Sequence, residues 1–162
     1  MTNTNFINRL TLCWSDKLLI FTIRNSVAIS IPSYTMCVAA HNGFKRITGI
    51  DLSKKLCDAA KQNCNTTQEK IPEVEFDIIN NDAFYYDIPE DVDCIFMFNP
   101  FDEIIMSGVA NNIHESLREH PREMKIIYVN PLHKSLFTNT GFKEVYYSKK
   151  MKYLEVAILE KS

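Results

Sequence analysis

Glycine is scarce in this chain. Only four glycines occur among its 162 residues, at positions 43, 49, 108 and 141, whereas glycine averages about 7% of residues in proteins. The scarcity excludes a collagen-like sequence. The first 42 residues contain no glycine at all, so a tight turn there has to form without the residue that most easily adopts a positive φ.

Several other features are absent. No apolar run approaches the ~18 residues that a membrane-spanning helix needs, and the start MTNTNFINRL lacks the pattern of a signal peptide. The five cysteines contain no CxxC pair and the four histidines are scattered, so we predict no metal site and no disulfide framework. Walker, GxSxG, HExxH and kinase motifs are also missing. These absences favour a cytoplasmic protein with reduced thiols and no membrane association.

The composition is that of one globular domain. Hydrophobic residues make up 46% and charged residues 23% of the chain, which excludes intrinsic disorder. The net charge of −2 is unevenly distributed, because residues 69–103 hold eleven acidic residues and one basic residue. An acidic middle disfavours long nucleic acid as a partner, since phosphate backbones need a basic face.

Strand and helix patterns alternate from residue 35 onward. Strands are predicted at 46–52, 74–79, 93–98 and 125–129, and helices at 35–41, 53–64, 102–120 and 132–138. The near-continuous apolar runs 94–98 and 125–129 predict adjacent central strands that are buried on both faces. In the second helix, Leu56, Ala60 and Cys64 recur every fourth residue and predict its buried face.

The end of the chain follows a different pattern. Two β-rich runs, 142–148 and 153–159, are separated by a short basic turn rather than by a helix, which predicts an antiparallel hairpin at one edge of a mostly parallel α/β sheet. We expect an α/β domain over residues 35–162, preceded by an N-terminal segment over residues 1–34. Within that segment, the runs 18–23 and 27–31 form either a hairpin or, in one of them, the first parallel strand.

Polar residues follow four of the predicted strands, where ligands bind in sheets of this type. Asp51 could accept hydrogen bonds from the vicinal hydroxyls of a ribose, or cap the next helix. Asp82 could accept from an adenine amine, or simply form a turn. Asn99, Pro100 and Phe101 could hold a ligand, or could simply end the strand. For Asn130, Pro131 and His133, a turn is favoured over a ligand site.

The order and content of these motifs resemble class I S-adenosylmethionine-dependent methyltransferases. The resemblance covers residues 36–160 and is best in MCVAAHNGFKRITGIDLSKKLCDAAKQN, residues 36–63; it continues through the Asp82 loop, the Phe-Asn-Pro-Phe strand end and the closing hairpin. It implies a Rossmann-like three-layer sandwich whose seven-stranded sheet contains one antiparallel strand, and S-adenosylmethionine as the cofactor.

The resemblance also implies roles for particular residues. Asp51 would bind the ribose hydroxyls of the cofactor, and Asp82 would meet the adenine amine beside Ala83 and Phe84. Asn99, Pro100 and Phe101 would face the sulfonium methyl group and the methyl acceptor. The acceptor is expected to be a small molecule or a protein side chain.

The chain departs from the family between its first strand and first helix. The family has an acidic residue and a GxGxG-type loop there, which lets the backbone approach the cofactor, whereas residues 26–34 read SVAISIPSY. Pro32 has no backbone N–H to donate, and the residues that stand in place of the family's glycines carry side chains where glycine has only a hydrogen atom. The alternatives are therefore a methyltransferase, a non-catalytic or truncated Rossmann-like remnant that binds cofactor weakly or not at all, and a nucleotide-binding regulator.

Overall fold

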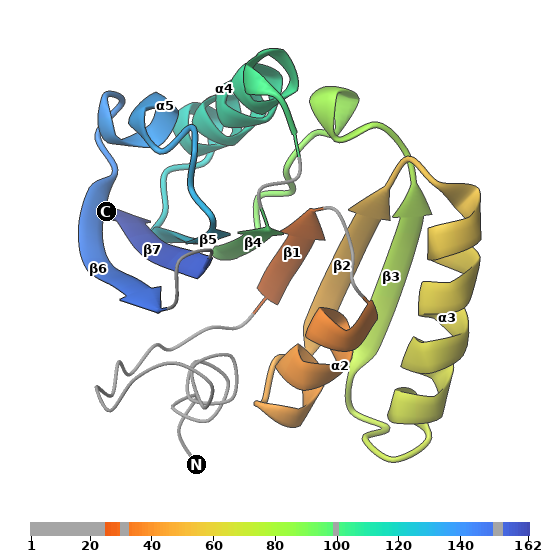
Figure 1. Ribbon diagram of the computed structural model, residues 1–162. Helices are drawn as coiled ribbons and strands as arrows, with labels where there is room; N and C mark the ends of the chain where they lie inside the picture. Colours follow the sequence, from red (N-terminus) through yellow and green to blue (C-terminus); the bar gives the residue numbers. More distant parts are fainter. Residues whose placement is uncertain (1–24, 30–32, 99–100, 151–153) are drawn as a thin grey trace.

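The computed structural model describes residues 25–29, 33–98, 101–150 and 154–162 (Figure 1). In these ranges seven strands form one sheet in the order β3-β2-β1-β4-β5-β7-β6. The parallel strands are β1 (Asn25–Ile29), β2 (Arg46–Asp51), β3 (Glu75–Asn80), β4 (Cys94–Phe98) and β5 (Met124–Val129). The last two, β6 (Lys143–Lys150) and β7 (Leu154–Lys161), are antiparallel to each other, and β7 is antiparallel to β5. The predicted hairpin at the sheet edge is confirmed.

Helices lie against both faces of the sheet. The helices α2 (Ser33–His41) and α3 (Lys54–Gln68) belong to one face, and α4 (Glu103–Glu119), α5 (Ser135–Thr138) and the 3-10 turn η1 (Ala83–Tyr85) to the other. Each face has its own buried apolar cluster, so the core is two layers thick around the sheet. This is the mixed α/β architecture that alternating strands and helices predict.

The strand β1 is the first strand in the described part of the chain. Asn25 pairs with Arg46 of β2, and Ser26 pairs with Cys94 of β4, both in parallel register. Of the two alternatives for the N-terminal segment, a first parallel strand is therefore present at Asn25–Ile29, and the sheet starts upstream of residue 35. The run 18–23 lies outside the described residues.

The central strands are buried as the apolar runs predict, with one exception. Ile95 and Met97 face the α4 side and Phe96 faces the α2 side, and all three are at most 5% exposed. Phe98, the last residue of β4, is 45% exposed, because it reaches the carboxyl edge of the sheet where no described helix covers it.

The helix α3 buries two of the three predicted residues, Ala60 and Cys64, but not Leu56. Its buried residues are Cys57, Ala60, Cys64 and Thr67, whereas Leu56 is 51% exposed. Both Leu56 and Cys57 are compatible with a stripe through Ala60, at spacings of four and three. The smaller Cys57 fits against the strands, where its Sγ lies 3.4 Å from the Asp51 carbonyl and 3.7 Å from the Ile79 carbonyl.

The helix ends follow local sequence signals. Asp102 caps α4 and Ser53 caps α3 through side-chain oxygens that accept backbone N–H groups. At the end of α2, Gly43 adopts φ 93°. The Gly43 N–H donates to the Ala40 carbonyl and the Phe44 N–H donates to the Ala39 carbonyl, which is the Schellman pattern that the Asn42-Gly43 signal predicts.

Candidate cofactor site

A cavity of about 170 Å³ lies at the carboxyl edge of the sheet. Residues from the end of β2, the end of β3 and the start of α4 surround it, and buried Ile50 contributes to its wall. The lining residues are Ile50, Asp51, Leu52, Asn81, Asp82, Ala83, Phe101 and Ile105. The structure therefore brings four of the predicted site residues, Asp51, Asp82, Ala83 and Phe101, to one cavity.

Hydrogen bonds hold the Asp51 corner of the cavity. The Asp51 carboxylate accepts from the Ser53 N–H at 2.7 Å, which fixes its orientation as the chain leaves β2. The Asn80 side-chain amide donates to the carbonyls of Asp51 and Leu52 at 3.0 and 2.8 Å, and so ties the ends of β2 and β3 together. Burial, aided by the negative charge of Asp51, raises the pKa of the Cys57 thiol, which keeps it a protonated donor beneath this corner.

The Asp82 corner is held by its own turn. The Asp82 carboxylate accepts from the Phe84 N–H at 2.9 Å and caps η1, and the Asn81 side-chain oxygen accepts from the Asp82 N–H at 2.8 Å. Ala83 is 6% exposed and closes the wall behind this carboxylate. Asp82 thus forms the expected turn and also lines the cavity, while its contact with an adenine amine stays a prediction.

Phe84 lies against α4 rather than in the lining of the cavity. Its ring atoms come within 2.3 Å of the point where a Cβ on Gly108 would lie, so the ring occupies the space left by that glycine. It also makes an edge contact with Tyr85, with ring centroids 4.9 Å apart. A role for Phe84 beside the adenine stays a prediction.

The predicted acceptor-facing residues are only partly described. Phe101 lines the cavity, whereas Asn99 and Pro100 lie outside the described residues. Sequence reasoning did not find Ile105, which reaches the cavity from the first turn of α4. Its helical spacing with Val109, Ile113 and Leu117 gave the only signal, and that signal indicated core packing.

The fourth strand end is structural. Asn130 adopts φ 50°, donates its N–H to the Glu155 carbonyl at 2.7 Å, and accepts the Glu155 N–H on its side-chain oxygen at 3.0 Å. These two bonds fasten the end of β5 to β7. The turn interpretation of Asn130 and Pro131 thus has a direct physical reason, because asparagine tolerates the left-handed region.

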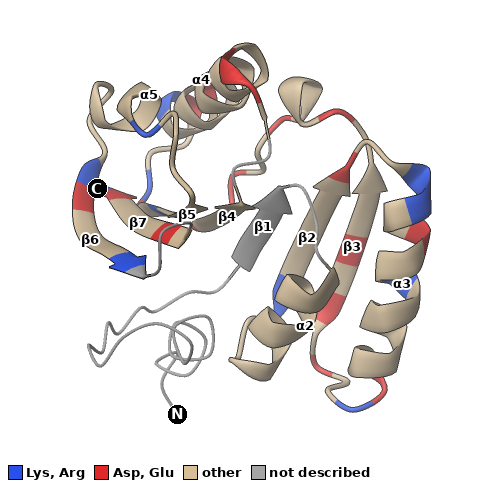
Figure 2. Ribbon diagram, viewed as in Figure 1, with Lys and Arg blue, Asp and Glu red and all other residues tan. Residues whose placement is uncertain are grey.

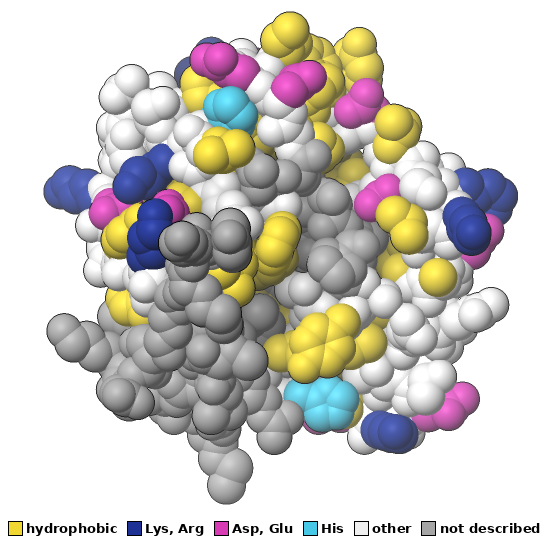
Figure 3. All heavy atoms as spheres, viewed as in Figure 1, with side chains coloured by type: hydrophobic (Ala, Val, Ile, Leu, Met, Phe, Trp, Pro, Cys, Tyr) yellow, Lys and Arg dark blue, Asp and Glu magenta, His cyan; other side chains and the backbone are white. Residues whose placement is uncertain are grey.

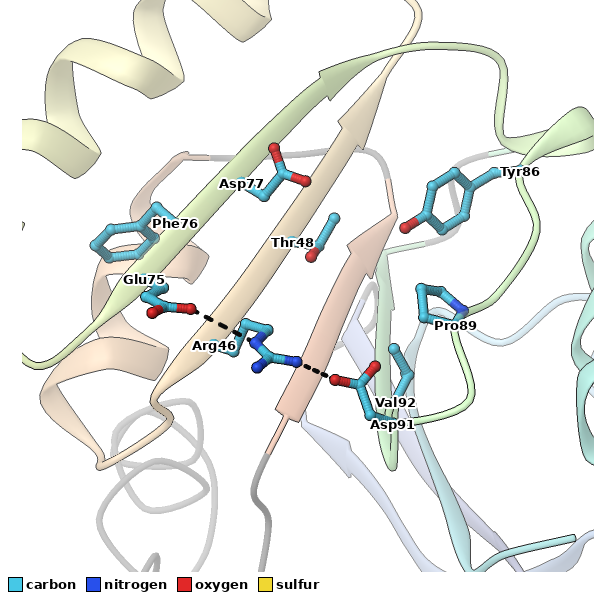
Figure 4. Close-up of a pocket in the computed structure, with 9 residues that line it drawn as sticks. All are labelled: Arg46, Thr48, Glu75, Phe76, Asp77, Tyr86, Pro89, Asp91 and Val92. Carbon is cyan, nitrogen blue, oxygen red and sulfur yellow. Dashed lines mark hydrogen bonds and ion pairs between the residues drawn. The ribbon is translucent and has the colours of Figure 1, made fainter. Parts of the chain in front are cut away.

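A second cavity of about 510 Å³ lies lower on the sheet, between β2, β3 and the connection from β3 to β4. Figure 4 shows Arg46 between Glu75 and Asp91, with Tyr86 pointing toward Thr48. Arg46 pairs with Glu75 at 3.6 Å and also with Asp91. Because Arg46 and Glu75 begin their strands, this cavity is remote from the carboxyl edge and is not the predicted site.

Other classes of site find little support in the described ranges. No group of three or more histidine, cysteine, aspartate or glutamate side chains there is arranged to hold a metal ion. Cys37, Cys57, Cys64 and Cys94 are free thiols. Among the helices that the structure describes, none is both long and apolar enough to span a membrane.

Comparison with known proteins identifies the fold. No protein-family model and no curated protein sequence matches the chain. Similar solved structures include a TehB-like S-adenosylmethionine-dependent methyltransferase from Corynebacterium glutamicum, with a TM-score of 0.62 and 15% identity over 99% of this chain and 87% of that one. A ribosomal protein L11 methylase from Lactobacillus delbrueckii subsp. bulgaricus gives a TM-score of 0.63 and 15% identity, over 99% of this chain and 77% of that one.

A third similar structure contains a ligand. The N-methyltransferase NodS from Bradyrhizobium japonicum, solved in complex with S-adenosylhomocysteine, gives a TM-score of 0.61 and 10% identity, over 98% of this chain and 85% of that one. The chain therefore has the Rossmann-like fold of the class I S-adenosylmethionine-dependent methyltransferases. Identities this low concern the fold, and the activity has to be argued from the site.

Proposed function

We propose that this chain is an S-adenosylmethionine-dependent methyltransferase-like protein that binds its cofactor at the carboxyl edge of β2 and β3. The observation that carries the proposal is the convergence of Asp51, Asp82, Ala83 and Phe101 on one cavity. These residues come from three separate chain segments, and parallel α/β sheets bind ligands at this edge.

The donor set fits the adenosine part of the cofactor. Asp51 offers a carboxylate for ribose hydroxyls, and Asp82 offers one for the adenine amine next to the apolar surfaces of Ala83 and Ile50. Phe101, with Asn99 and Pro100 before it, is proposed to face the methyl-bearing sulfur and the acceptor. When bound, S-adenosylmethionine supplies an activated methyl group, and the residues of this chain orient it and limit water access.

The glycine-free connection supports the weak-binding alternative. Only residues 30–32 join Ile29, the end of β1, to Ser33, the start of α2. Residues 26–34 contain no glycine, so fewer backbone groups are placed to meet the cofactor's carboxylate. We propose that affinity for S-adenosylmethionine is weak and that methyl transfer is at most slow.

The test is calorimetric titration with S-adenosylmethionine and S-adenosylhomocysteine. Asp51→Ala should weaken whatever binding is measured by about ten- to hundredfold, as expected for losing ~1.5–3 kcal/mol of hydrogen bonding by a charged group. Asp58→Ala removes an exposed acid that pairs with Lys54 at 3.2 Å, and is the matched control that should leave binding unchanged. Unchanged affinity in Asp51→Ala would falsify the site.

The same titration separates the two alternatives for the chain as a whole. Low-micromolar affinity in the unmodified chain would contradict the remnant interpretation and favour the active enzyme. Binding that appears only after a glycine-rich loop with a preceding acid replaces residues 29–33 would favour the remnant. The methyl acceptor is proposed to be a small molecule or a protein side chain, and the proposed location is the cytoplasm.

A further inference from the structure

Four of the five most exposed large apolar side chains of the described residues share one position in the fold. Each is 73–75% exposed, and each belongs to a different connection that follows a parallel strand. We call these four residues the apolar rim: Leu52, Tyr85, Ile104 and Leu132. The fifth, Tyr34, lies elsewhere, because the neighbouring Ser33 hydroxyl accepts from the Asn63 side chain in the second half of α3.

The topology places the rim along one edge. Because the carboxyl ends of parallel strands meet at the same side of a sheet, the connections after β2, β3, β4 and β5 start along one edge (Figure 1). Figure 3 shows apolar side chains gathered along the upper part of the molecule, over the start of α4 and the connections beside it. From β3 to β5 the strand order spans four steps of ~4.8 Å, so the rim is roughly 19 Å wide.

The rim differs from ordinary surface exposure. Two further exposed apolar residues lie at the same edge, Leu56 at 51% in the first turn of α3 and Phe98 at 45% at the end of β4, so six of the nine exposed large apolar residues of the described ranges lie there. The other three are Tyr34, Val145 and Tyr147. Single exposed apolar residues are common in proteins, whereas a grouped set marks an interaction surface. A width of roughly 19 Å suits a protein partner, since specific protein interfaces bury ~800 Å² on each side.

Charge around the rim indicates the kind of partner. Asp82 is near Tyr85 in sequence, and Asp102 and Glu103 immediately precede Ile104. Figure 2 shows acidic residues at the tip of β2, along the connection after β3 and at the start of α4, and basic residues at the start of α3. Of the basic residues near the rim, Lys54 pairs with Asp58 and Lys134 with Glu144. Apolar side chains beside carboxylates favour a partner segment that carries apolar and basic residues.

We propose that the apolar rim is the docking surface for a protein substrate, which brings a basic, apolar segment across the carboxyl edge and its acceptor side chain to the cavity. This proposal rests on the proposed function and narrows the acceptor to a protein side chain. The rim then positions the acceptor, and the cavity positions the methyl donor. Three other occupants, namely a small molecule, a lipid surface and a second copy of this chain, are outcomes of the test.

The experiment uses a fluorescein-labelled 14-residue peptide of alternating leucine and lysine as the probe, with binding measured by fluorescence anisotropy. The rim variant Ile104→Ser/Leu132→Ser should weaken binding at least about tenfold. The control variant Val145→Ser/Tyr147→Ser removes two exposed apolar side chains of β6, outside the rim, and should bind within about twofold of the unmodified chain. Circular dichroism on both variants verifies that they are folded.

Two more peptides define what the rim recognises. Replacing leucine by serine in the probe, or lysine by glutamate, should each reduce binding at least about tenfold. Equal affinity for the rim variant and the control variant, no binding of the leucine–lysine peptide, or tight binding of the glutamate peptide would overturn the proposal.

Parallel measurements identify the other occupants. Co-sedimentation with vesicles of phosphatidylcholine and phosphatidylglycerol that the rim variant loses would assign the rim to a lipid surface. A dimer in sedimentation velocity that the rim variant dissociates would assign it to a second copy. Titration of S-adenosylmethionine into the same samples distinguishes failure of the rim proposal from failure of the proposed function. The rim variant should bind S-adenosylmethionine with the affinity of the unmodified chain. A chain that binds the peptide but no cofactor would contradict the proposed function and leave the rim as a protein-docking surface.

Discussion

The connection from β2 to β3 and the connection from β3 to β4 cover opposite faces of the same strands by different means. The first contains the 15-residue helix α3, which packs an apolar stripe on the sheet. The second contains only the three-residue turn η1 and extended chain. The helix satisfies its own backbone groups, whereas the extended connection has to find partners elsewhere.

The helix α4 supplies those partners. The Asn112 side-chain amide donates to the carbonyls of Phe84 and Tyr86 at 2.9 and 3.1 Å, and the Ser116 hydroxyl donates to the Ile88 carbonyl at 2.8 Å. Arg122, just beyond the helix, donates to the carbonyls of Val92 and Pro89 and to other backbone oxygens. A sheet face without a covering helix is thus held by side chains, and it leaves room for the 510 Å³ cavity (Figure 4).

The largest expected effect comes from Arg122→Met. It keeps the apolar stem but leaves the carbonyls of Val92 and Pro89 without this donor, which should lower the free energy of unfolding by about 2–3 kcal/mol. Urea denaturation followed by circular dichroism measures the change. Arg118→Met is the control: Arg118 is exposed and pairs with Glu115 at 2.8 Å, so its loss should cost no more than about 0.5 kcal/mol. Equal losses in the two variants would contradict the role of Arg122.

The next effect tests how closely the connection approaches α4. A Cβ at Gly108 would lie 2.3 Å from the Phe84 ring, so Gly108→Ala should destabilise by about 1–2 kcal/mol, although alanine favours the helix. In a Phe84→Ala background the same change should instead stabilise by about 0.5–1 kcal/mol, since only the helix preference remains. The double-mutant cycle measures the coupling, and strictly additive changes would show that the two residues do not contact.

The smallest expected effect is a pH dependence of stability, and it concerns His114, on the side of α4 away from this connection. Burial, and then the positive charge of Lys161, lower the pKa of His114 below its ordinary 6.5. The unfolded chain therefore binds more protons than the folded chain as the pH falls below about 6.5, and stability contributed by neutral His114 is lost there.

This pH dependence should weaken in His114→Gln, measured as the slope of the unfolding free energy between pH 7 and pH 5. The His41→Gln variant changes an exposed histidine at the end of α2, and it should keep the slope of the unmodified chain. A slope that His114→Gln leaves unaltered would assign the acid sensitivity to other groups.

Local features were predictable because their causes are local. Ser53, Asp102 and Gly43 terminate helices through bonds to residues within five positions, so the printed sequence already shows the signal. Strands β4 and β5 were predictable because burial on both faces requires an unbroken apolar run. The buried face of α3 was predictable only in part, since the choice between Leu56 and Cys57 depends on which side chain fits against the strands beneath.

The candidate site divides in the same way. From the sequence alone, Asp51 and Asp82 are expected to follow strands and therefore to lie at the carboxyl edge of a parallel sheet. Three features depend on how the chain packs: β2 and β3 are neighbours, Ile105 reaches the same cavity, and Phe84 fills the space above Gly108. Strand ends are set by hydrogen-bond and apolar patterns along the chain, whereas a cavity is set by the packing of side chains that lie far apart in it.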